Sequence, residues 1–148
     1  AIERHKNTGH VGLGFLGKYG LKRGAVATSI GHDSHNLVIA GVTDEDMVLA
    51  GNRVIENGGG LAIALAGKVL ADLPLPIGGL MADEPVEVVD EKLEHMKKLS
   101  VELGISEDID AFMTPAGYSK AEAEYIWSGR CGEASGGGSQ VLDLLFHI

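Results

Sequence analysis

Short apolar runs bounded by turn residues recur along the first half of the chain and predict β-strands. Residues 25–30 and 37–42 carry almost no charge, which is typical of buried strands. Residues 61–65 and 69–73 flank a short segment at 66–68, and this spacing predicts a hairpin with a tight turn.

Two further segments carry strand signals of a less regular kind. Apolar positions alternate with glycine in residues 11–16, which predicts a strand that another backbone approaches closely. Residues 73–76 contain Pro74 and Pro76. Because proline has no N–H to donate, we expect this second segment to leave the ladder.

The hydrophobic period then changes and predicts two helices. Thr43 and Asp46 form a capping-box pattern, and apolar residues recur at helical spacing from there to the glycines at 58–60. A second helix opens at Pro85 and stops at Gly104. Its apolar stripe consists of Val86, Val89, Leu93, Met96, Leu99 and Leu103.

The order of these elements describes an α+β domain, in which a small, mostly antiparallel sheet has the two main helices packed on one face. We expect this domain to cover residues 1–114. Residues 115–148 form a divergent tail that contains a Gly/Ser stretch, and the sequence leaves its order open. Because the chain begins with Ala1 rather than Met, we expect it to be cut from a longer protein.

Composition narrows the classes of function. A chain of 148 residues suffices for one domain, and its formal net charge of −9 argues against nucleic acid or an anionic membrane as a partner. The single cysteine, Cys131, excludes an internal disulfide and a cysteine-based zinc site. No apolar run reaches the length of a membrane span, so we expect a cytoplasmic protein.

The most polar stretch of the chain lies between the first two predicted strands and is the candidate catalytic site. It contains His32, Asp33, Ser34, His35 and Asn36. These side chains can move a proton or hydrogen-bond a ligand. In the alternative interpretation the stretch is a turn in which the Asp, Ser and Asn side chains bond their own backbone. A metal site on His32 and His35 would need a third ligand from elsewhere, and we expect no metal or cofactor bound by this chain alone.

Several segments are informative through their order and spacing: residues 2–5, 8–9, 22–30, 32–36, 52–56, 58–60, 73–77, 79–81 and 112–114. Together they resemble the C-terminal domain of bacterial and archaeal adenine deaminases, and several motifs in register are more specific than any one of them. Beyond residue 114 the family would continue with an apolar, proline-containing segment. This chain departs from that pattern.

The resemblance implies an amidohydrolase-superfamily enzyme that converts adenine and water into hypoxanthine and ammonia. In that family an N-terminal barrel carries the metal-binding residues, and a divalent manganese or iron ion is expected there. None of the barrel motifs occurs in this chain. The resemblance therefore implies an accessory domain that is inactive alone, whose partners are the barrel and adenine. The loop at 32–36 would project toward the barrel mouth.

Two other functions stay open at this stage. The chain would also suit a stand-alone binding or interaction module that has kept the fold and lost the chemistry. An independent metal hydrolase that uses His32 and His35 is the second alternative. The sequence does not decide whether the chain forms a homo-oligomer.

Overall fold

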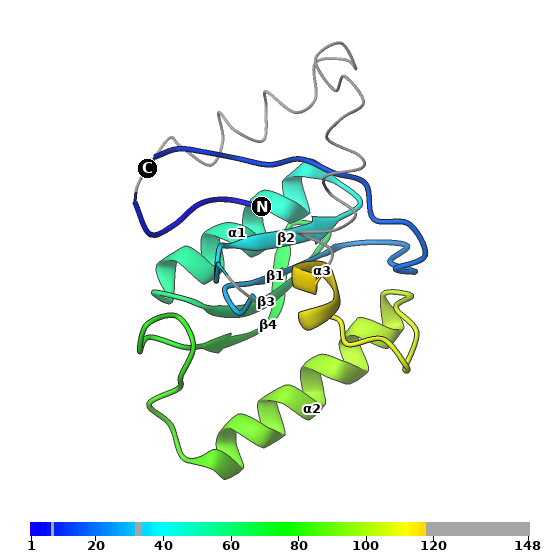
Figure 1. The fold of residues 1–148 in the computed structure, drawn as a ribbon. Helices are drawn as coiled ribbons and strands as arrows, with labels where there is room; N and C mark the ends of the chain where they lie inside the picture. Colours follow the sequence, from blue (N-terminus) through cyan, green and yellow to red (C-terminus); the bar gives the residue numbers. More distant parts are fainter. Residues whose placement is uncertain (7, 32–33, 118–148) are drawn as a thin grey trace.

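The computed structural model describes residues 1–6, 8–31 and 34–117. These residues contain a four-stranded sheet and three helices (Figure 1). In chain order the elements are β1 (Ala25–Thr28), β2 (Val38–Gly41), α1 (Asp44–Glu56), β3 (Gly60–Leu65), β4 (Lys68–Pro74), α2 (Val86–Glu102) and α3 (Met113–Gly117).

The sheet has the strand order β2-β1-β3-β4, and every neighbouring pair is antiparallel. The central strands β1 and β3 therefore pair on both sides, while β2 and β4 lie at the edges. The predicted α+β class with a small antiparallel sheet is confirmed. The hairpin is also confirmed, because β3 and β4 are joined by Ala66 and Gly67, which both have positive φ as a tight two-residue turn requires.

The two main helices pack on opposite faces of the sheet, so the prediction that both lie on one face is wrong (Figure 1). Every residue of β1 is buried, and so are the first five of β3. A strand that is apolar on both faces needs a cover on each. Ala27 and Ala62 pack with α1, and Ile63 packs with α2.

Local sequence signals place the ends of α1 and α2 as expected. Thr43 is the N-cap of α1, and its side chain accepts a hydrogen bond from the backbone N–H of Asp46. Asp46 is itself buried, and its carboxylate accepts from the backbone N–H of Gly67 at 2.9 Å. This bond ties the first turn of α1 to the hairpin. Helix α2 follows Pro85 and ends before Gly104, which has φ +109°.

Two strand predictions need correction. Residues 12–16 form no strand, and in this region only Val11 makes an isolated bridge, to Ile2. Glycine alternation leaves few side chains to pack, and Phe15 is 77% exposed. The other correction concerns Pro74, which stays in β4 instead of leaving the ladder. An edge strand tolerates proline, because one side of its backbone has no partner.

The tail predictions lie largely outside the described residues. Helix α3 runs across the boundary expected after residue 114, and nothing beyond residue 117 is described. Within the described part of the chain, no helix combines the length and the apolar character needed to cross a membrane.

Candidate functional site

Four segments meet at the end of β1: the end of β1 itself, the start of β3, the loop after β4 and the N-terminal segment that carries Arg4. Buried Ser29 connects the first three of these segments. Its backbone N–H donates to the carbonyl of Gly60 at 3.0 Å, and its Oγ accepts from the N–H of Gly60 at 2.7 Å. The same hydroxyl donates to the carbonyl of Gly79 at 2.6 Å. The end of β1, the start of β3 and the loop after β4 are therefore joined by one side chain.

Glycines allow these loops to touch. A Cβ on Gly59 would lie 2.3 Å from the Cα of Gly79, and one on Gly60 would lie 2.1 Å from the carbonyl oxygen of Leu73. Both Gly59 and Gly60 have positive φ, at +129° and +134°. Gly59 and Gly60 therefore serve close backbone contact at this end of the sheet.

Arg4 joins the candidate loop to the loop after β4. Its Nε donates to the carbonyl of His35 at 2.5 Å, and its Nη2 donates to the carbonyl of Gly78 at 2.8 Å. The guanidinium also lies against Gly79, where a Cβ would come within 2.5 Å of it. Sequence reasoning did not select Arg4 as a functional residue. Its only signal was its place in the segment 2–5 that resembles the family.

The structure describes three of the five predicted site residues. His35 has φ +47°, and its Nδ1 accepts a hydrogen bond from the backbone N–H of Gly31 at 3.2 Å. Ser34 is exposed, and its carbonyl accepts from Nε2 of His5 at 2.6 Å. Asn36 is half-buried. His32 and Asp33 lie outside the described residues.

The hydrogen bond to Gly31 determines which nitrogen of His35 carries the hydrogen. A backbone N–H can only donate, so Nδ1 accepts and the neutral ring is protonated on Nε2. Nε2 makes no hydrogen bond within the described residues. The described part of the loop thus offers an oriented N–H donor at Nε2 of His35, and this arrangement suits recognition of an acceptor atom on a ligand.

The N-terminal segment that carries Arg4 is held by Glu3. Its carboxylate accepts from the backbone N–H groups of His5, Lys6 and Thr8 and from the Thr8 hydroxyl. Desolvation raises the pKa of Glu3, but these hydrogen bonds outweigh it and lower the pKa from 4.5 to about 2.

This lowered pKa predicts an acid-sensitive N-terminal segment. The carboxylate of Glu3 stabilises the folded state fully above its ordinary pKa of 4.5, and that contribution is lost as the pH falls toward about 2. Glu3→Gln is therefore expected to lower the thermal unfolding midpoint near neutral pH and to converge with the unsubstituted chain at acid pH. Thermal unfolding measured along a pH series tests this. A deficit that does not change with pH would contradict it, and exposed Glu107→Gln is the control.

The Ser29 network predicts a cost for removing one hydroxyl. Ser29→Ala leaves the N–H of Gly60 without its acceptor in a buried site, so we expect a loss of about 1–3 kcal/mol in the free energy of unfolding. Urea denaturation measures the loss. The exposed Ser34→Ala is the matched control and should stay within about 0.5 kcal/mol of the unsubstituted chain. Equal losses in the two variants would count against the network.

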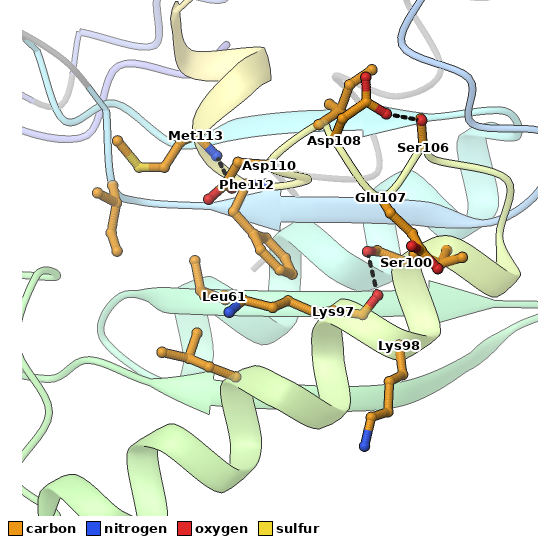
Figure 2. Close-up of a pocket in the computed structure, with 14 residues that line it drawn as sticks. Leu61, Lys97, Lys98, Ser100, Ser106, Glu107, Asp108, Asp110, Phe112 and Met113 are labelled. Atoms are coloured by element: carbon orange, nitrogen blue, oxygen red, sulfur yellow. Dashed lines mark hydrogen bonds between the residues drawn. The ribbon is translucent and has the colours of Figure 1, made fainter.

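A separate groove lies between α2 and the segment that leads into α3, on the sheet face opposite α1 (Figure 2). It encloses about 630 Å³. The Phe112 ring points toward Leu61 on its floor, and Lys97 and Lys98 extend from α2. Asp110 is engaged as a cap, because its carboxylate accepts from the N–H groups of Phe112 and Met113.

The groove has an apolar floor and a charged rim, and none of the described residues that line it is a histidine or a cysteine. It therefore has the character of a contact surface. Its lining includes Ile30, which lies two residues before the candidate loop. Sequence reasoning missed the groove because both main helices were expected on one face of the sheet, which leaves no helix to form it on the opposite face. Among the described residues, no three His, Cys, Asp or Glu side chains come together in a way that could hold a metal ion.

The sequence model of a family described as the adenine deaminase C-terminal domain matches residues 1–120. Adenine deaminase 2 of Carboxydothermus hydrogenoformans is 49% identical over 115 residues, which are 78% of this chain and 20% of that protein. The adenine deaminase of Kosmotoga olearia is 53% identical over 114 residues, which are 77% of this chain and 20% of that protein.

The adenine deaminase of Nitratidesulfovibrio vulgaris strain DP4 is 50% identical over 114 residues, or 76% of this chain and 20% of that protein. The chain thus spans about a fifth of the length of the curated relatives it matches. In those relatives the matching region is one part of a larger adenine deaminase. The chain belongs to the family of adenine deaminase C-terminal domains.

Proposed function

We propose that this chain acts as the C-terminal domain of an adenine deaminase and supports the conversion of adenine and water into hypoxanthine and ammonia. The chemistry would take place in an amidohydrolase barrel elsewhere in the same protein, with manganese or iron as the metal. The observation that carries the proposal is the identity of about half the residues to adenine deaminases over a region that is only a fifth of their length.

The loop that contains His35 is the part of this domain we assign to the catalytic domain's purine pocket. Arg4 holds the loop through the backbone carbonyl of His35, and the bond from Gly31 orients the ring. The free Nε2–H would donate to an acceptor of the purine or to a side chain at the mouth of the barrel. A loop that only connected two strands would need neither the arginine nor the oriented ring.

A domain exchange tests the proposed function. Residues 1–117 of this chain would replace the matching region of the Kosmotoga olearia adenine deaminase, and ammonia release from adenine would be measured. We expect the chimera to deaminate adenine and a variant that lacks the domain to lose the activity. A folded chimera as inactive as the deletion variant would overturn the proposal. Purine binding by the isolated 148-residue chain, measured by calorimetry, would instead favour a stand-alone binding module.

Histidine replacement in the active chimera tests the role of the loop. His35→Ala is expected to lower kcat/KM for adenine about tenfold, which corresponds to one lost hydrogen bond of about 1.4 kcal/mol. His32→Ala belongs in the same series. His95→Ala is the control, because His95 is exposed on α2 and should leave the kinetics unchanged. Unchanged kinetics for His35→Ala, with only a lower melting temperature, would contradict a role at the pocket.

A further inference from the structure

Backbone pairing along the outer edge of β2 has already begun at Leu37, the residue just before the strand. β1 occupies one side of β2 in antiparallel register, from Thr28 opposite Val38 to Ala25 opposite Gly41. On the other side Ile2 pairs with Leu37, the residue directly before β2. The Ile2 N–H donates to the Leu37 carbonyl at 2.7 Å, and the Leu37 N–H donates to the Ile2 carbonyl at 3.0 Å.

Strand alternation then determines which backbone groups of β2 face outward. Because the N–H and C=O of Leu37 point to Ile2, those of Ile39 and Gly41 point to the same outer side. The groups of Val38 and Ala40 point to β1. The hydrogen bond from Val42 N–H to the carbonyl of Gly24 fits this alternation. Among the described residues, Ile39 and Gly41 have no strand partner on the outer side.

The pairing at Ile2 also fixes the path of any residue upstream of Ala1. The pair is antiparallel, so Ala1 falls opposite Val38, and the three residues before it fall opposite Ile39, Ala40 and Gly41. Figure 1 places the N-terminus beside β2. An extended segment that continued in this direction would present its N–H and C=O groups to Ile39 and Gly41.

A second backbone pairs with residues 1–3 on the side away from β2. Ala1 and Gly12 exchange hydrogen bonds of 2.8 Å in both directions, and Glu3 N–H donates to the carbonyl of His10 at 3.0 Å. Residues 1–3 therefore already lie between two backbones. The chain beyond Gly12 carries apolar side chains that are exposed in the described structure, namely Leu13 at 48%, Phe15 at 77% and Leu16 at 37%.

We propose that the segment directly preceding this domain in the longer protein adds a fifth strand to the sheet along the outer edge of β2. This inference rests on the proposed function, in which the catalytic part precedes Ala1. The connection between the two parts would then be a hydrogen-bonded strand, and this strand would fix the position of the candidate loop relative to the barrel. It would also cover the edge of β2, where Ile39 and Gly41 have no strand partner among the described residues.

The register predicts the chemistry of the added strand. Ile2 and Leu37 share the sheet face covered by α1, and Ile39 packs against the same cluster. The residue directly before Ala1 falls opposite Ile39 and therefore points to that face. An apolar side chain is expected there.

Amide hydrogen exchange in the full-length protein tests the added strand with an internal control. If the strand forms, the N–H groups of Ile39 and Gly41 exchange about as slowly as those of Val38 and Ala40, which bond β1. If it does not form, Ile39 and Gly41 exchange at least about tenfold faster than their neighbours. That alternating pattern would overturn the proposal.

Two variants identify the occupant of the edge. Proline at the residue directly before Ala1 removes the donor to the Ile39 carbonyl and should speed exchange at Ile39 and Gly41. Deletion of residues 118–148 should leave both amides protected. If the deletion speeds exchange at both amides and the proline variant does not, the tail occupies the edge and the proposal is overturned. Adenine deamination measured in parallel separates the two hypotheses, because an active enzyme with unprotected amides refutes only the added strand.

Discussion

Met96→Ala is expected to lower the free energy of unfolding by about 2–5 kcal/mol. Met96 is fully buried and lies where α2 packs on the sheet, in the cluster that contains Ile63, Leu73 and Leu103. Truncation removes three heavy atoms from this cluster and leaves a cavity that the surrounding strands and helix cannot close completely. Urea denaturation followed by circular dichroism measures the loss.

A matched variant on the same helix controls for helix propensity. Val86 is 72% exposed at the first residue of α2, so Val86→Ala should change the free energy of unfolding by no more than about 0.5 kcal/mol. The packing of α2 on this face would be refuted if the two variants lost the same stability. It would also be refuted by a loss below about 1 kcal/mol for Met96→Ala.

Gly60→Ala is expected to cost more than about 3 kcal/mol, because two effects add at this position. The backbone φ of +134° is a conformation that residues with a Cβ rarely adopt. The new Cβ would also lie 2.1 Å from the backbone oxygen of Leu73. Any shift that relieved this contact would disturb the bond that the Gly60 carbonyl accepts from the Ser29 N–H and the bond that the Gly60 N–H donates to the Ser29 Oγ.

Gly67→Ala separates the two effects. Gly67 also has positive φ, at +74°, but nothing lies within 4 Å of the position of its Cβ. Its replacement should therefore cost only about 1–2 kcal/mol of backbone strain. Denaturation of both variants gives the comparison. Equal losses in the free energy of unfolding would mean that the close contact between β3 and β4 at Gly60 adds no cost to that of the positive φ.

The same close contacts determine the geometry of the candidate site. Ser29 and Gly60 hold the end of β1 against the start of β3, and Arg4 spans from the candidate loop to Gly78. Substitutions that disturb these contacts would change the position of the candidate loop, although the substituted residues themselves contact no ligand. Arg4 is therefore a positioning residue of this end of the sheet.

The sequence located the candidate loop correctly between two strands but gave no information on its partners. His35 and its neighbours stand out because polar residues concentrate between two buried runs. Arg4 is 31 residues away from His35 and 74 from Gly78, and no local pattern connects them. Such contacts depend on how the chain folds back on itself, which periodicity does not encode.

Local chemistry by itself determined the elements. The Thr43 cap, the helical spacing of α2, the turn at Ala66 and Gly67 and the apolar runs of β1 and β3 are properties of neighbouring residues, and each is found where the sequence placed it. Only the tertiary structure decided the arrangement. Both faces of β1 are apolar, so each face of the sheet needs a helix to cover it, and α1 and α2 pack on opposite faces. The hydrophobic pattern along a helix does not say which of the two faces it covers. The pairing of Ile2 with Leu37 was decided in the same way, because it joins residues far apart in the chain through backbone groups that every sequence carries.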